Sequence, residues 1–285
     1  MPNVIAISAL LIGLAAAASA QVADGDQHWA LRAEGHQSGH AKAPHVDAAI
    51  AAYQRAVTQN PNDLEARWKL LRAIRFKGAY VASSSDEKKQ IYSTAKKAGE
   101  DTLAVVDRLL SAKGMKSVSK ATEKQVADVA KAIPGADEVY LWDAVNWGEW
   151  ALAYGKMAAV REGAADRIRR EATIAMLMDP KLEGGAPSRV LGRLHDQTPR
   201  IPFITGWASN REALRFLNES LKADPTNKIT KVFLAEAMVN GNSDTKPQAI
   251  QSLKELLTTP NDPNYEVEQA AAQDDARALL KEWGA

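Results

Sequence analysis

The chain of 285 residues contains no cysteine. Disulfides, thiolate metal sites and a cysteine nucleophile are therefore excluded, and so is the lipid-bearing cysteine that tethers some exported bacterial proteins to a membrane. An excess of charge is missing as well, because 36 basic residues against 35 acidic ones leave a formal net charge of +1. Such a balance produces no global field that would attract a polyanion, so the composition argues against nucleic-acid binding.

Long apolar runs are confined to the start of the chain. The first twenty residues carry no charged side chain, and their apolar stretch ends in Ala-Ser-Ala before Gln21. This pattern predicts a secretory signal peptide over residues 1–20. No later segment approaches the roughly 20 apolar residues of a membrane span. We therefore expect a periplasmic or otherwise secreted protein that is soluble after signal cleavage.

Alternation at a period of two is also missing, so the sequence predicts an all-α fold. The spacing of small and apolar residues before a proline is that of the second helix of a tetratricopeptide repeat. It occurs at Ala49, Tyr53, Ala56 and Pro61, again at Ala213, Leu217, Ser220 and Pro225, and less well at Ala249, Leu253, Leu256 and Pro260. We predict one degenerate helical-repeat domain over residues 21–285, with about five helix pairs and a capping helix from Pro263 to Trp283.

One predicted helix near the middle of the chain holds three of the seven tryptophans within nine residues. At a helical period, Trp147 and Trp150 share one face with two tyrosines, while Trp142 and Asn146 share the neighbouring face. The tryptophans either pack between repeats or line a ligand cleft. Asn146 either binds a loop backbone or contacts the ligand, because a buried amide needs partners. We take these four residues as candidate ligand-binding residues.

A second predicted helix follows two adjacent glycines and begins at Pro187. Adjacent glycines allow a close backbone approach, and proline suits a first helical turn. Arg189 and Arg193 lie four residues apart and therefore share a face. They either clamp an anion or form ion pairs across repeats, with Glu149 the kind of partner expected. Both arginines are candidate ligand-binding residues.

Four motifs occur in a characteristic order between residues 91 and 240. They are Trp142-x3-Asn146-Trp147-Gly148, Gly184-Gly185-x3-Arg189-x2-Gly192-Arg193-Leu194, Ala213-Leu214-x2-Leu217-x3-Leu221-x2-Asp224-Pro225-x-Asn227 and Lys231-Val232-Phe233-Leu234-Ala235-Glu236. In this order they resemble the T-component (TatT) family of TRAP transporters, which are periplasmic tetratricopeptide proteins that accompany a solute-binding protein. The double glycine and the Gly-Arg-Leu triplet are the most specific part of the resemblance.

The resemblance implies a bundle of degenerate repeats with an internal cleft, a periplasmic solute-binding protein as partner, a small organic or apolar ligand, and a homotrimer. It does not extend to the lipid-bearing cysteine, which this chain lacks. The alternative hypothesis is a generic tetratricopeptide adaptor that binds a peptide or protein on its concave face.

A histidine-rich segment has no counterpart in that family. His28, His36, His40 and His45 lie within eighteen residues, and His36 and His40 have the spacing of a helical metal site. The glycines around them disfavour a helix, so a solvated loop is the favoured interpretation over weak metal capture, and we predict no metal site.

No recognisable catalytic motif is present: there is no nucleophile elbow, phosphate loop, HExxH sequence or paired-carboxylate motif. We therefore predict a protein that is not an enzyme and needs no cofactor. The remaining enzymatic alternative is an unrecognised hydrolase whose acid and base converge only in the folded chain.

Overall fold

The structure, a computed structural model, describes residues 18–285. The predicted signal peptide lies outside this range except for its last three residues, which begin a helix over residues 18–30. The helices that follow are α2 (Ala43–Gln59), α3 (Leu64–Tyr80), α4 (Ser85–Ala112), α5 (Glu123–Ala130), α6 (Ala136–Tyr154), α7 (Lys156–Arg161), α8 (Ala164–Met178), α9 (Leu182–Gln197), α10 (Asn210–Ala223), α11 (Lys228–Gly241), α12 (Lys246–Thr258) and α13 (Glu266–Glu282). Residues 18–285 contain no β-strand.

Successive helices pack as hairpins. The pairs are the helix over residues 18–30 with α2, then α3 with α4, α6 with α8, α9 with α10, and α11 with α12. The last helix, α13, packs on α11 and α12 and ends the array. The short helices α5 and α7 are additions to this pattern. The prediction of an all-α, degenerate tetratricopeptide-like array with a C-terminal capping helix is therefore confirmed.

The starts of several helices are explained by their caps. The side chain of Asp63 accepts a hydrogen bond from a backbone N–H in the first turn of α3, and the Ser84 side chain does the same for α4. Thr122 and Gln125 form a reciprocal capping box at the start of α5. Each cap satisfies a donor that the helix itself leaves free, which stabilises the helix by about 1 kcal/mol.

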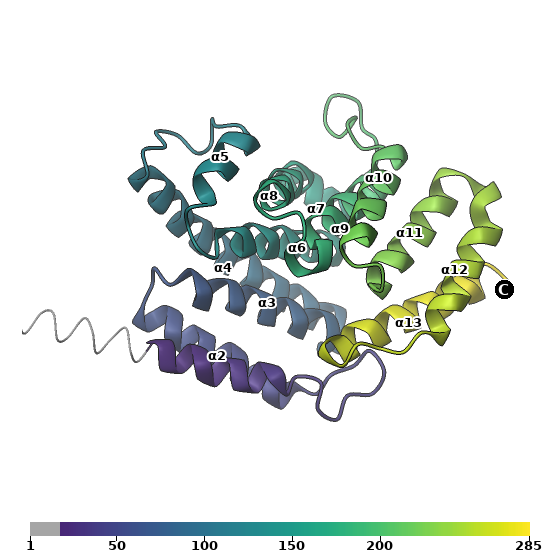
Figure 1. Cartoon of the computed structure of the whole chain (residues 1–285), viewed down its shortest axis with the longest axis horizontal. Coiled ribbons are helices and arrows are strands. Elements are labelled where there is room, and N and C mark those ends of the chain that lie inside the picture. The colour runs from purple at the N-terminus through teal and green to yellow at the C-terminus, as the bar shows by residue number, and fades with distance from the viewer. Residues whose placement is uncertain (1–17) are drawn as a thin grey trace, which may run out of the picture.

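The inner helices of the array form a ring. Helix α3 contacts α6, α6 contacts α9, α9 contacts α11, and α11 contacts α13. Helix α13 in turn reaches back to α3, so the last helix of the chain lies against the first repeats (Figure 1). A tetratricopeptide array is usually an open superhelix. Here the closed ring converts its concave face into an enclosed space.

The histidine-rich loop between the first two helices closes the ring. Arg32 forms an ion pair with Glu268 of α13 at 3.2 Å, and the Ser38 hydroxyl donates to Asp274 Oδ2 at 2.6 Å. At Gly39 an added Cβ would lie only 2.6 Å from the Cα of Ala271. The loop and α13 are therefore packed backbone to backbone at this seam.

The adjacent glycines have the close-approach role that the sequence indicates. Gly184 and Gly185 have φ values of +63° and +76°, which bend the chain before the regular part of α9. A Cβ on Gly185 would meet Ser220 O at 3.0 Å, and one on Gly192 would meet Leu217 at 2.6 Å. Glycine at these positions therefore allows α10 to pack directly against α9. Although α9 as a whole runs from Leu182, residues 183–185 have non-helical backbone angles, so its regular part begins after the bend, at Ala186 and Pro187, where the sequence predicts a helix start.

Candidate ligand-binding cavity

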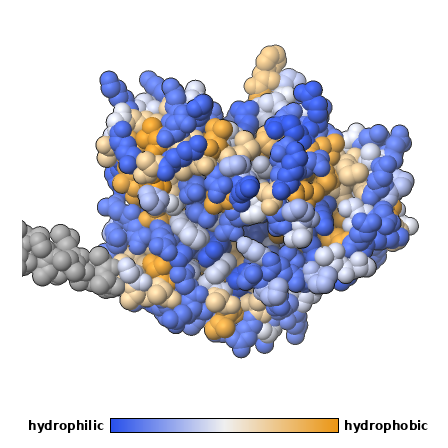
Figure 2. All heavy atoms as spheres, viewed as in Figure 1, coloured by the Kyte–Doolittle hydropathy of each residue, from blue (hydrophilic) through white to orange (hydrophobic). Residues whose placement is uncertain are grey.

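The ring of inner helices encloses a cavity of about 1260 Å³. Ligand pockets of roughly 300–1,000 Å³ hold drug-sized molecules, so the space suffices for an organic ligand of considerable size. The face viewed in Figure 2 is hollowed near its centre. Helices α3, α6, α9, α11 and α13 all contribute side chains to the wall.

Helix α6 presents its two predicted faces to different surroundings. Trp142 and Glu149 line the cavity. Trp147 and Trp150 instead lie in a core cluster between α6 and α8, where they are 2% and 7% exposed. Their rings form an edge-to-face pair with centroids 5.6 Å apart. The structure thus separates the three tryptophans, and only Trp142 lies on the cavity.

Asn146 lies in the core between the two faces of α6. It is fully buried, and its Nδ2 donates to Leu71 O of α3 at 3.2 Å and to Trp142 O at 2.8 Å. The amide therefore joins two inner helices through backbone carbonyls, and its partners are helical rather than the loop backbone that the sequence suggests. Asn146 does not line the cavity.

Trp142 is held in place by a carboxyl group with an unusual environment. Its Nε1 donates to Glu138 Oε2 at 3.0 Å. Burial, together with the negative charges of Glu183 and Asp137, raises the pKa of Glu138 to about 7. The group beside the cavity tryptophan therefore changes charge near neutral pH.

Most arginines on the cavity wall have a carboxylate partner. Arg75 binds Glu149 through Nε and Nη2, at 3.0 and 2.8 Å, and its Nη1 donates to Tyr80 Oη. The other ion pairs of wall arginines are Arg32 with Glu268, Arg72 with Glu183 and Arg193 with Glu236. The sequence suggests Glu149 as the kind of partner for Arg189 and Arg193, but in the structure Glu149 pairs with Arg75 of α3.

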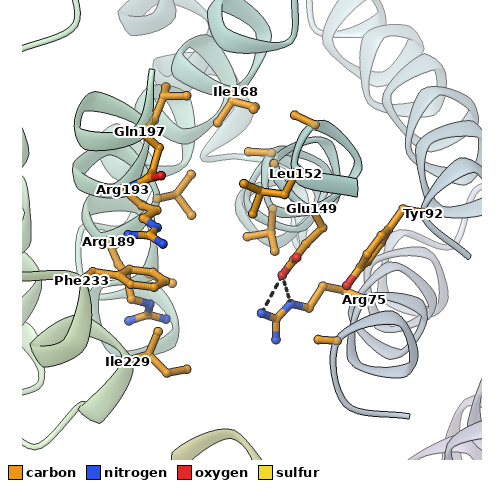
Figure 3. Close-up of a pocket in the computed structure, with 18 of the residues that line it drawn as sticks. Arg75, Tyr92, Glu149, Leu152, Ile168, Arg189, Arg193, Gln197, Ile229 and Phe233 are labelled. Carbon is orange, nitrogen blue, oxygen red and sulfur yellow. Dashed lines mark hydrogen bonds and ion pairs between the residues drawn. The ribbon is translucent and has the colours of Figure 1, made fainter. Parts of the chain in front are cut away.

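Arg189 differs from these arginines. Its one hydrogen bond within residues 18–285 is a long contact of 3.4 Å from Nη1 to Thr230 Oγ1, and no ion pair is recorded for it there. Burial, and then the positive charge of Arg75, lower the pKa of Arg189 to about 10. Figure 3 shows its guanidinium pointing into the cavity between Phe233 and Ile229.

The charge of Arg193, one turn further along α9, is compensated by two carboxylates. Its Nη1 lies 2.6 Å from Glu236 Oε2 and 3.6 Å from Asp196 Oδ2, and its guanidinium stacks 4.3 Å above the Phe233 ring. The two arginines therefore share a face, as predicted, but not a role. Arg193 matches the ion-pair interpretation, whereas Arg189 forms no ion pair among the described residues and feels the charges of Glu183 and Asp224 only from farther away.

The cavity wall becomes apolar towards α7. Leu152, Val160 and Ile204 line the cavity there and are also exposed, at 67%, 36% and 51%. The loop before α10 projects beside them (Figure 1), and its Phe203 is fully exposed with φ at +66°. One mouth of the cavity is therefore rimmed by apolar side chains.

Sequence reasoning missed part of this wall. Arg75 and Ile229 belong to no motif, and the motif that contains Phe233 does not indicate a cavity; these residues line one cavity because α3 and α11 both belong to the ring. The Gly-Gly bend that sets the direction of α9 was the available signal for Arg189. No local signal indicates the return of α13 to α3.

Comparisons with known proteins leave the family open. No family model matches the chain, and no curated protein matches it. The TPR2AB domain of yeast Sti1, solved as a complex with pHSP90, is similar at 13% identity with a TM-score of 0.29, covering 94% of this chain and 98% of that chain. Because that score is low, the helical-repeat description rests on this chain's own helix pairs.

Within residues 18–285 no helix is both long and apolar enough to span a bilayer. Within the same range no group of three or more histidine, aspartate or glutamate side chains has the arrangement of a metal site.

Proposed function

We propose that this chain is a non-enzymatic helical-repeat protein that binds an organic anion with an apolar body inside its ring. The observation that carries the proposal is Arg189, the wall arginine that has no carboxylate partner among the described residues. A cation removed from water needs a compensating anion, and a guanidinium binds the two oxygens of a carboxylate at once.

The surroundings of Arg189 support an amphipathic ligand. Phe233 and Ile229 flank the guanidinium, and Val190 lines the wall on the same helix (Figure 3). An anion bound here would place its apolar part against these side chains and towards Leu152. Burying apolar ligand surface against them contributes about 25 cal/mol per Å².

We further propose that the protein acts as an accessory to a solute-binding protein, as its resemblance to the T-component family of TRAP transporters implies. The apolar rim around Leu152, Val160 and Ile204 is the surface on which such a partner would dock, because a ligand could then pass into the cavity without crossing water. Export to the periplasm and a homotrimer belong to the same proposal.

The alternative is a tetratricopeptide adaptor that binds a peptide on its concave face. The ring closure disfavours it, because an extended peptide needs an open groove, and here α13 closes the array against α3. An adaptor of this shape would have to expose its partner site elsewhere.

A fluorescence titration distinguishes the two functions, because Trp142 reports on the cavity. Under the cavity proposal, decanoate quenches the tryptophan emission saturably, and a Trp142→Phe variant loses most of that change. Under the adaptor hypothesis no member of an organic-acid panel changes the emission saturably. Denaturant unfolding of the variant is the control for its stability.

Partner docking requires a second experiment. The chain without its predicted signal peptide is immobilised and exposed to a periplasmic extract of its source. We expect recovery of a solute-binding protein in near-stoichiometric amount, and weaker recovery with Ile204→Asp, which places a charge on the rim. Equal recovery by both chains would contradict the assignment of this rim.

A further inference from the structure

The loop between α9 and α10 carries an apolar tip that projects from the body of the protein (Figure 1). The tip has the sequence Ile201-Pro202-Phe203-Ile204, in which Phe203 is fully exposed and Ile204 is about half exposed. Figure 2 shows apolar colouring on the same projection. Ile201 and Ile204 line the cavity, whereas Pro202 and Phe203 do not. The outer part of the tip therefore points into solvent and away from the cavity.

The backbone of the tip is held in a defined shape. Thr205 is buried, and its hydroxyl donates to Pro199 O and accepts a hydrogen bond from the N–H of Ile201 at 3.0 Å. Within this frame Phe203 has a φ of +66°, a conformation that bulky side chains rarely adopt. Such strain persists only where the surrounding structure imposes it, and it is commonest at functional positions. The fold thus holds a large apolar ring in water in spite of the strain.

Apolar exposure in this chain is concentrated around the tip. Six of the nine large apolar side chains that are exposed within residues 18–285 lie in residues 152–160 or 203–204. Among them Met157 of α7 is 69% exposed and, like Phe203, lies outside the cavity wall. Single exposed apolar residues are normal on a protein surface, but a group of them in one region marks a contact surface.

The charged side chains of these two segments are all basic. Residues 150–161 contain Lys156 and Arg161, residues 197–208 contain Arg200, and neither segment contains an aspartate or a glutamate. All three cations are exposed, and none forms an ion pair with another described residue. The carboxylates that flank the two segments are paired with other cations, namely Glu162 with Lys96, Asp166 with Arg169 and Asp196 with Arg193. The region around the tip therefore complements an anionic surface.

The combination of a projecting apolar tip with unpaired cations fits a lipid surface best. A second copy of this chain would bring the same cations together, which costs binding energy through like-charge repulsion. A folded partner would need a preformed socket for the ring of Phe203. A bilayer needs none, because apolar side chains enter the boundary between headgroups and acyl chains while basic residues bind anionic headgroups.

We propose that the outer part of the tip, centred on Phe203, inserts into the surface of a membrane that contains anionic phospholipids. Arg200, Lys156 and Arg161 lie at the headgroups, and the contact is peripheral. The membrane surface is adjacent to the rim at which a solute-binding protein is proposed to dock. Its contact with lipid requires neither that partner nor a ligand in the cavity.

The test is co-sedimentation of the chain with lipid vesicles, without any cavity ligand. The predicted signal peptide is omitted so that its apolar run does not itself bind lipid. One set of vesicles contains equal parts of phosphatidylcholine and phosphatidylglycerol, and the other contains phosphatidylcholine alone. We expect saturable binding to the anionic vesicles and binding at least about tenfold weaker to the neutral ones, because each basic residue near an anionic surface contributes about fivefold.

Two substitutions separate the apolar and the charged parts of the contact. Phe203→Asn weakens binding to anionic vesicles by at least about tenfold, because the buried area of the ring is lost. Arg200→Gln weakens it by about fivefold. Leu177→Gln and Lys281→Gln, which alter an exposed apolar residue and an exposed cation of α8 and α13, are the matched controls and leave binding unchanged.

The fold of the key variant is preserved by design. Asparagine adopts a positive φ more readily than phenylalanine does, so Phe203→Asn keeps the helical circular dichroism and the melting temperature. Equal binding of this variant and the unmodified chain to anionic vesicles would overturn the proposal. A chain that binds neither kind of vesicle would overturn it too. In that case, weaker recovery of a solute-binding protein by Phe203→Asn would assign the tip to a protein socket.

Discussion

Charged side chains gather on both sides of α6, and the two clusters differ in whether each charge has a partner of opposite sign. On the core side, Asp143 of α6 is fully buried against Arg167 and Glu171 of α8, with Arg167 2.9 Å from an oxygen of each carboxylate. On the cavity side, Arg189 faces the cavity and forms no ion pair among residues 18–285. The core cluster contains both signs of charge in contact, whereas we propose that an anionic ligand completes the cavity cluster.

The titration of the core cluster supports this distinction. Burial, and then the charge of Asp143, raise the pKa of Glu171 well above its usual range, and burial also raises the pKa of Asp143. Both shifts disfavour two negative charges beside the single cation Arg167, which joins the two carboxyl groups of α6 and α8.

The largest expected effect comes from breaking the core cluster. Arg167→Met leaves two carboxyl groups buried without their cation, which costs about 3–5 kcal/mol of unfolding free energy. Urea denaturation measures the loss. Arg169→Met, which removes an exposed ion pair with Asp166 on the same helix, is the control and costs about 1 kcal/mol or less. Equal effects of the two substitutions would remove the distinction between the clusters.

The second largest expected effect is a pH dependence of the unfolding free energy, and it arises at Glu138 beside the cavity. Because the pKa of Glu138 is raised from 4.5 to about 7 in the folded chain, the folded state holds its proton more tightly than the unfolded state does. The stabilising contribution of protonated Glu138 is fully present below pH 4.5 and is lost as the pH rises to 7. The loss is at most about 3 kcal/mol. Glu138→Gln flattens this part of the stability profile, as denaturation at several pH values would show.

A smaller effect on stability is expected at the contact between the histidine-rich loop and α13. Gly39→Ala inserts a methyl group against the Ala271 backbone and so strains the contact that encloses the cavity, at a cost of about 1–3 kcal/mol. Thermal unfolding is the measurement. Gly206→Ala is the matched control, because a Cβ there meets nothing closer than 3.8 Å. Equal melting temperatures for the two variants would show that Gly39 is not packed tightly against Ala271.

Arg189 is expected to have the smallest effect on stability. Because it has no ion pair among the described residues, Arg189→Met removes a desolvated charge and leaves no carboxylate unmatched. We expect an unfolding free energy within about 1 kcal/mol of the unmodified chain. A loss of several kcal/mol, measured by urea denaturation, would show that Arg189 has a structural partner after all.

The sequence was sufficient for the helical-repeat elements of the fold, but not for the closure of the ring by α13 and only partly for the site. Helical periodicity, caps such as Ser84 and the repeat spacing at Ala49 and Ala213 are local signals, so the elements could be predicted. Arg189 could be selected because the adjacent glycines mark its helix. Its difference from Arg193 could not, because that difference depends on Glu236, which the fold brings from α11.

The tryptophans show the same limit. Periodicity placed Trp147 and Trp150 on one face and Trp142 on another, but it could not say which face packs against α8 and which lines the cavity. The contact between His28 and His45, whose Nδ1 atoms lie 3.3 Å apart, could not be predicted either, because it depends on the turn between their helices. In each case the sequence shows which residues are present, but only the long-range packing of the helices determines what surrounds them.

The most direct test of the central claim is a calorimetric comparison of decanoate with uncharged decanol. We predict that the unmodified chain binds decanoate at least about tenfold more tightly, and that Arg189→Met abolishes this preference while keeping its affinity for decanol. Lys156→Met, which removes an exposed cation from the cavity wall, should retain the preference. An undiminished preference for decanoate in Arg189→Met would contradict the account.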